Sequence, residues 1–230
     1  GILDPDYTDR VIGRAQKDVT LSENLYYKYR DRSDLAPPNV TEGWGFKIDD
    51  PPLRFARTDI HGYQFAVDVL CDFRWKDDLP CKRSIVLRLW SQDDRMFVRE
   101  DWDSNQIIDL YTQNALTERV MARFHFEEAV LDTSEPPYHM HIGGLAKANE
   151  FCWLHPKIDV PRFPFPPMDL VLMCELVGAN FYPQTYRKIR NDSTWKGCIL
   201  KSQDALLRRY FEDCCTDIGN HQTIFSAHLD

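Results

Sequence analysis

The chain has 230 residues, of which 43% are hydrophobic and 13% aromatic, and its formal net charge is −8. This length supports one domain whose buried core needs no disulfide or structural metal to hold it together. The acidic balance argues against broad, nonspecific binding to duplex nucleic acid, although it leaves room for a local basic groove.

The cysteine pattern predicts free thiols in a reducing cytoplasm, because the count is odd and no CxxC pair occurs. The seven residues are Cys71, Cys81, Cys152, Cys174, Cys198, Cys214 and Cys215. No apolar signal segment opens the sequence as given. The longest apolar run, residues 168–182, contains Asp169 and Glu175 and is too short and too charged to cross a bilayer. We therefore expect no membrane partner.

The chain is expected to form a single domain over residues 1–230, with a helical N-terminal appendage over residues 1–45. Apolar residues recur at helical spacing through residues 8–32, which predicts one or two helices. A turn-rich linker follows at residues 36–45, and Pro51 and Pro52 are expected to interrupt the segment after it.

Residues 60–145 are predicted to form an antiparallel sheet. Every second residue through residues 63–75 is apolar, which is typical of one long, half-buried strand. Further strands are expected at residues 84–90 and 96–99, and a short helix at residues 105–116 is expected to cross an edge of the sheet.

Residues 165–217 are predicted to form a helical layer. Pro166 and Pro167 are expected to open a helix over residues 168–182, because the first-turn N–H groups have no helical partner. This helix is apolar on nearly every side, so Leu172, Cys174 and Leu176 should be deeply buried. A last helix is expected over residues 202–217, with a buried stripe made of Leu206, Leu207, Tyr210, Phe211 and Cys214.

The fold class that follows is α+β. We expect a strongly twisted antiparallel sheet, or a half-barrel, packed on one face by helices from the N-terminal and C-terminal parts of the chain.

Residues 120–144 contain the most informative pattern in the chain, since apolar and polar residues alternate at both ends. This alternation predicts a hairpin that places three histidines and an arginine on one face of the sheet and apolar side chains on the other. The polar set is Arg123, His125, His139 and His141, and the apolar set includes Phe124, Phe126 and Met140. We expect His125 to pair with His139, and Arg123 to face His141.

Three chemistries fit this arrangement. The imidazoles of His125, His139 and His141 could bind a divalent metal such as zinc or manganese, with an oxygen ligand supplied by Glu127, Glu150 or Asp169. Two histidines with near-neutral pKa could instead act as acid and base without a metal, as in a ribonuclease, while Arg123 stabilises a phosphorane. The face could also bind an anion or nucleotide through Arg123 and Arg162. A purely structural role, in which the histidines hydrogen-bond to one another and to solvent, remains the alternative to all three.

Four short motifs over residues 120–183 resemble the pattern of an uncharacterised bacterial family. They are Arg123-x-His125, then His139-x-His141-x-Gly143-Gly144, then Pro161-Arg162-Phe163-Pro164, and last Asn180-Phe181-Tyr182-Pro183. Small proteins with an HxH motif occur in toxin–antitoxin and phage-defence settings. By association, the resemblance implies a nucleic-acid or nucleotide target.

The leading hypothesis is a bacterial cytoplasmic effector that acts as a phosphodiesterase or nuclease-type hydrolase. Its catalytic residues would be His125, His139, His141 and Arg123, and Arg162 would bind the phosphate. The alternative is a non-catalytic subunit of a defence or toxin–antitoxin system that binds a nucleotide or a partner protein in the same concavity.

Overall fold

The computed structural model describes residue 3 and residues 5–30, 43–60, 63–77, 79–91, 119–128, 136–143 and 162–219. Its centre is an antiparallel sheet with the strand order β1-β3-β4-β5-β6-β7, in which β2 pairs separately with one end of β3. The strands are β1 (Trp44–Arg54), β2 (Thr58–Ile60), β3 (Tyr63–Lys76), β4 (Leu79–Ser91), β5 (Arg119–Glu128), β6 (Tyr138–Ile142) and β7 (Phe163–Pro164).

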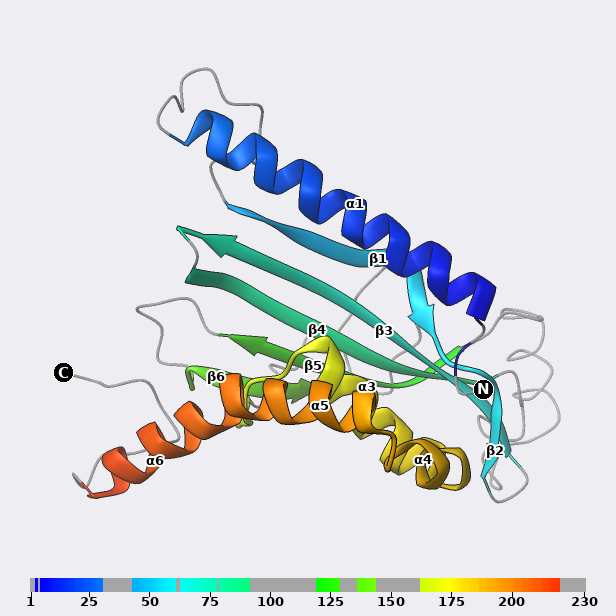
Figure 1. Cartoon of the computed structure of the whole chain (residues 1–230). Helices are drawn as coiled ribbons and strands as arrows, with labels where there is room; N and C mark the ends of the chain where they lie inside the picture. Colours follow the sequence, from blue (N-terminus) through cyan, green and yellow to red (C-terminus); the bar gives the residue numbers. More distant parts are fainter. Residues whose placement is uncertain are drawn as a thin grey trace, which may run out of the picture.

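One long helix precedes the sheet and a series of helices follows it. They are α1 (Pro5–Tyr29), α3 (Leu170–Phe181), α4 (Pro183–Ile189), α5 (Ser193–Ser202), the π-helical turn η4 (Gln203–Arg208) and α6 (Arg209–Gly219). The fold is therefore α+β with a twisted antiparallel sheet, as the sequence predicted, and the twist is plain in Figure 1.

The longest alternating segment of the sequence forms β3, which pairs with both β1 and β4. The strand predicted at residues 84–90 exists but is longer, since β4 begins at Leu79. Pro51 and Pro52 interrupt the pairing of β1 with β3, as expected, because the register shifts between Ile48 and Leu53, although the strand itself continues to Arg54. Prolines are tolerated here because β1 is an edge strand. The predicted strand at residues 96–99 and helix at residues 105–116 lie outside the described residues.

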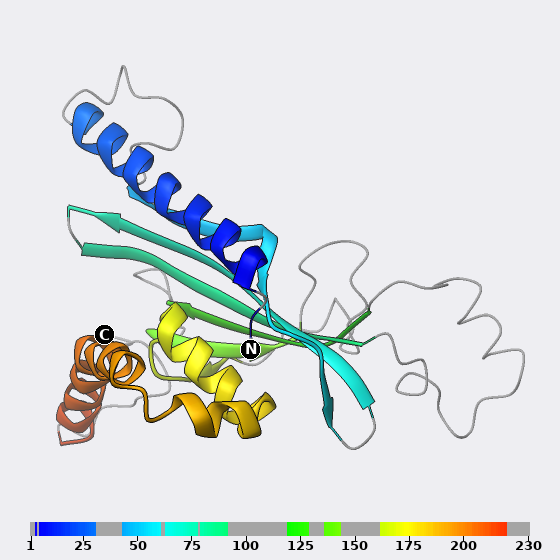
Figure 2. The same cartoon turned by 45° about the vertical axis from the view of Figure 1, so that its right-hand side comes forward.

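One face of the sheet carries the hydrophobic core. Its buried strand residues include Val67, Val69, Cys71, Phe73, Ile85, Leu87 and Phe126. α3 adds Met173 and Val177, which are fully buried, and α1 adds Val11 and Ala15 to the same core. Figure 2 shows α3 lying against the sheet and α1 running beside β1. Helices from both ends of the chain thus contribute to one core.

α1 covers the edge strand β1. The hydroxyl of Tyr7 donates to the carbonyl oxygen of Pro52 at 2.6 Å. The hydroxyl of Ser22 donates to the carbonyl oxygen of Gly45 at 2.8 Å and accepts the N–H of Gly45 at 3.1 Å. These bonds engage backbone groups that an uncovered edge would offer to another strand. The helix that the sequence placed in an appendage of residues 1–45 therefore packs along the edge of the sheet.

α3 differs from its prediction at its start and in its burial. It begins at Leu170, later than the proline pair, because the Asp169 carboxylate caps it by accepting the N–H of Leu172 at 2.8 Å. Leu172 is buried as predicted, but Cys174 and Leu176 are only half-buried. An apolar circumference does not force complete burial, because much of a folded protein's surface is itself apolar.

The last predicted helix, over residues 202–217, starts nearer the N-terminus than expected. α5, η4 and α6 follow one another without a break, since Gln203 and Arg209 keep right-handed helical angles. Of the predicted buried stripe, Leu206 and Leu207 pack against the core, whereas Phe211 is 53% exposed. Figure 1 shows the reason: α6 points away from the sheet.

The cysteines of the described residues agree with the predicted free thiols: Cys71, Cys81, Cys174, Cys198, Cys214 and Cys215 form no disulfide. Cys152 lies outside the described residues. Within those residues, no helix has the length and apolar character needed to span a membrane.

Candidate metal centre

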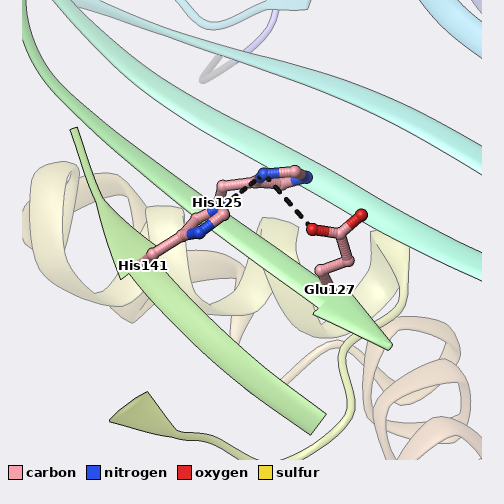
Figure 3. Close-up of side chains that lie close together, drawn as sticks. All are labelled: His125, Glu127 and His141. Carbon is pink, nitrogen blue, oxygen red and sulfur yellow. Dashed lines mark hydrogen bonds and ion pairs between the residues drawn. The ribbon is translucent and has the colours of Figure 1, made fainter. Parts of the chain in front are cut away.

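The candidate site lies on the sheet face that points away from α3 (Figure 3). Strand pairing arranges this face in rows, because directly paired residues point to the same side of a sheet. The rows are Asp68, Arg88 and Arg123; then Leu70, Val86, His125 and His141; then Asp72, Ser84, Glu127 and His139. Alternation within each strand therefore separates this polar face from the apolar core.

The hairpin between β5 and β6 has the predicted faces but not the predicted register. His125 pairs with His141 rather than with His139, and His139 pairs with Glu127. On the opposite face, Phe126 pairs with Met140. A shift of two residues keeps every side chain on its predicted face and changes only its partner, because the side-chain period of a strand is two.

His125 is the centre of the cluster. Its Nε2 atom lies 2.8 Å from the Ser84 hydroxyl, and its Nδ1 atom lies 2.5 Å from Nε2 of His141. The Glu127 carboxylate is 3.7 Å from the same Nδ1 atom. A ligand atom from each of His125, Glu127 and His141 lies within 4.8 Å of the other two. Figure 3 shows these three side chains converging from β5 and β6.

His139 does not belong to this ligand group, which corrects the predicted set of three histidines. Its ring is 5.9 Å from that of His141, its Nδ1 atom lies 3.0 Å from the carbonyl oxygen of Pro136, and it is almost completely buried. Glu127 takes its place in the group. His139 lies directly opposite Glu127, and the contact of its Nδ1 atom with the carbonyl oxygen of Pro136 engages a ring nitrogen outside the ligand group.

The other predicted oxygen ligands are not part of the cluster as described. The carboxylate of Asp169 is engaged as the cap of α3. Glu150 lies outside the described residues. Of the two predicted carboxylates that the structure describes, Glu127 and Asp169, it is Glu127 that lies with the histidines.

The predicted anion-binding arginines both act on the cluster through their charge. Arg123 is buried beside it, and its Nη1 atom donates to the carbonyl oxygen of Gly143 at 2.8 Å. The φ angle of Gly143 is 90°, a conformation that favours glycine. Arg162 is exposed, and its positive charge helps to lower the pKa of His141. Both arginines thus contribute to the low pKa of His141, and their role as anion ligands stays a prediction.

Burial is the main cause of the weak basicity of the two clustered histidines. It lowers the pKa of His125 to about 3, with further contributions from His141 and Arg123. Burial likewise lowers the pKa of His141 to about 4, helped by the charge of Arg123. Both imidazoles are therefore neutral at pH 7, which is the form that binds a metal ion.

Sequence reasoning missed two features of this face. Ser84, which contacts His125, lies in the polar phase of β4, but its partner depends on strand pairing. Asp68 is fully buried and paired with Arg88, whose Nε and Nη2 atoms donate to its two carboxylate oxygens at 2.7 and 2.9 Å. The sequence signal that could have predicted this ion pair was the presence of opposite charges at the polar positions of two neighbouring strands.

Comparison with known proteins gives no family: no family model, curated protein or solved structure matches the chain.

Proposed function

We propose that His125, Glu127 and His141 bind a divalent transition metal, and that the protein is a metal-dependent hydrolase of phosphodiesters in a nucleic acid or nucleotide. The observation that carries the proposal is the convergence of two neutral imidazoles and one carboxylate within 4.8 Å. Three protein ligands leave a coordination position for water or substrate, which is the arrangement of catalytic zinc sites.

The geometry requires a small movement before a metal can enter. Two nitrogens bound to one tetrahedral zinc lie about 3.3 Å apart, given zinc–nitrogen distances of about 2.0–2.1 Å. Nδ1 of His125 and Nε2 of His141 are 2.5 Å apart, a distance at which one nitrogen donates a proton to the other. A bound metal would replace that shared proton, and the two nitrogen atoms would have to move apart by about 1 Å.

The charges around the cluster favour an anionic substrate. Arg123 acts on both histidines and Arg162 acts on His141, whereas Lys82, which acts on His125, is itself paired with Asp72 at 2.6 Å. A metal lowers the pKa of its bound water and polarises a phosphoryl oxygen, while guanidinium groups bind the phosphate. A phosphodiester offers such an anion together with a bond that this chemistry hydrolyses.

The same pKa values favour the metal over metal-free acid–base chemistry. A general base works best with a pKa near the operating pH, and a ribonuclease-like pair would need two histidines near neutrality. The pKa values of His125 and His141 are lowered to about 3 and about 4 instead. Such weak bases are poor proton acceptors at pH 7 but remain able to bind a metal.

The second candidate is a non-catalytic subunit that binds a nucleotide or a protein on this face. The hydrogen-bonded chain from Ser84 through His125 to His141 favours it, because the chain is complete without a metal. A bacterial cytoplasmic setting in phage defence or toxin–antitoxin function rests on the resemblance and on cysteine usage, and it belongs to the proposal.

Metal titration of the purified, chelator-treated protein tests the proposal. We expect one zinc or manganese ion per chain by calorimetry, and loss of this binding in His141→Ala and Glu127→Gln. Glu128→Gln is the matched control: the neighbouring residue points to the other face of the sheet, so it should bind metal normally.

Hydrolysis is then measured with single-stranded and duplex DNA and RNA and with cyclic dinucleotides. Metal binding with cleavage that depends on His141 supports the hydrolase. Absence of metal binding refutes the metal centre. Metal-free binding of a nucleotide without turnover would establish the binding subunit instead.

A further inference from the structure

The helical run formed by α5, η4 and α6, here called the C-terminal helix (residues 193–219), has an apolar stripe on its exposed side. Leu200 is 64% exposed and Phe211 is 53% exposed, and between them lies Leu207, which packs partly against the core and is half-buried. All three side chains line one shallow cavity of about 600 Å³, which places them on the same side of the helix even though the π-helical turn η4 lies between Leu200 and Phe211.

The opposite side of the C-terminal helix is anchored to the body of the protein. Ile199 is buried, and the indole N–H of Trp195 donates to the Glu175 carboxylate of α3 at 2.8 Å. Further along, the rings of Tyr210 and Tyr138 meet edge to face with centroids 5.9 Å apart. These contacts fix the rotation of the helix, so the apolar stripe cannot turn inward.

The outer charges of the C-terminal helix differ in sign between its two ends: Lys196 and Lys201 lie toward its start, and Glu212 lies toward its end. Between them the charges alternate and pair within the helix, Arg208 with Asp204 and Arg209 with Asp213. Counted along the sequence, Lys201 and Glu212 are equally far from the point midway between Leu206 and Leu207. When two copies of such a helix pack antiparallel about that point, each Lys201 faces the Glu212 of the other copy. Antiparallel packing also opposes the two helix dipoles favourably.

We propose that the C-terminal helix packs antiparallel against the same helix of a second copy of this chain, forming a two-fold symmetric dimer. Leu207 lies near the symmetry axis, and Leu200 and Phe211 lie on either side of Leu207. The pairs of Lys201 with Glu212 of the other copy favour the antiparallel orientation of the two helices. The partner is a second copy because both the stripe and the charges are self-complementary, as a two-fold interface requires. A contact along one helix is small, so the dimer forms in a concentration-dependent equilibrium.

Sedimentation equilibrium of the full chain between about 1 and 300 μM tests the proposal. We expect the mass to rise from 27.0 kDa toward twice that value across the range. Leu200→Asp should keep the mass of a single chain throughout. Leu21→Asp is the matched control, since Leu21 on α1 is 61% exposed and lies away from the stripe. It should dimerise like the unaltered protein.

A charge exchange tests the direction of packing. Lys201→Glu alone or Glu212→Lys alone places like charges opposite one another and should weaken dimerisation at least tenfold. The double variant restores opposite pairs and should recover most of the loss. Circular dichroism and a thermal melt verify that every variant is folded. A single-chain mass for the unaltered protein at 300 μM, an unaffected Leu200→Asp dimer, or a double variant no better than its parents would each overturn the proposal.

Discussion

The polar face of the sheet contains two aspartates on β3 whose replacement should have very different consequences. Asp68 is fully buried, and its carboxylate accepts two hydrogen bonds from Arg88, which is itself buried. Asp72 is 13% exposed and pairs with Lys82, which is 47% exposed, at 2.6 Å, and with Arg74, which is 30% exposed, at 3.2 Å. Both residues belong to the same strand and the same face, so burial is the main difference between their ion pairs.

Asp68→Asn removes the charge and keeps the volume of the side chain. The guanidinium of Arg88 then stays buried without its counter-charge, and breaking a buried pair in this way costs about 3–5 kcal/mol. Asp72→Asn breaks a pair that water already screens, so we expect a loss of about 1 kcal/mol or less. At about 2–4 °C per kcal/mol for a chain of this size, the melting temperature should fall by roughly 10 °C for Asp68→Asn and by a few degrees for Asp72→Asn.

Urea unfolding monitored by circular dichroism measures both variants, with Arg88→Met and the Asp68→Asn/Arg88→Met double variant completing a thermodynamic cycle. The double variant should lose less free energy of unfolding than the sum of its parents, since it leaves no lone buried charge. Equal destabilisation by Asp68→Asn and Asp72→Asn, or simple additivity in the cycle, would refute the argument that burial decides the strength of these pairs.

Three further predictions concern pH, the core and the site. Folding holds the pKa values of His125 and His141 below the unfolded value near 6.5, so the unfolded chain binds more protons below that pH. In metal-free protein the free energy of unfolding should therefore fall as the pH drops below about 6.5, and by pH 5 the loss should reach about 2 kcal/mol for each histidine, or about 4 kcal/mol for the pair. A His125→Gln/His141→Gln variant measured by urea titration at each pH should lose less. Met173→Ala should cost about 2–5 kcal/mol in urea unfolding because Met173 is fully buried, whereas Leu21→Ala should change stability by less than about 0.5 kcal/mol. Arg123→Lys should weaken hydrolysis or nucleotide binding, since lysine cannot form a bidentate phosphate contact; unchanged activity in the cleavage assay would exclude Arg123 as a phosphate ligand.

Local periodicity by itself predicted the central strands β3 to β6 and the sides of their residues, but not β1, β2 or β7. The alternation through residues 63–75 predicted β3, because a one-residue slip would expose every buried side chain of the strand. The same reasoning placed His125, His139 and His141 on the face opposite Phe126 and Met140, which the pairing of β5 and β6 confirms. Helix ends were less predictable: the Asp169 cap, rather than the proline pair, sets the start of α3.

Tertiary structure decided which of the residues on one face meet. A shift of two residues leaves the alternation of a strand unchanged, so sequence periodicity could not distinguish the pairing of His125 with His139 from its pairing with His141. The actual register brings Glu127 into the cluster, and the neighbouring strand adds Ser84. The low pKa values of His125 and His141 likewise depend on burial and on charges from separate segments, including Lys82 and Arg162. Periodicity along one strand specifies the direction of a side chain, whereas desolvation and contacts across strands arise only when distant segments pack together.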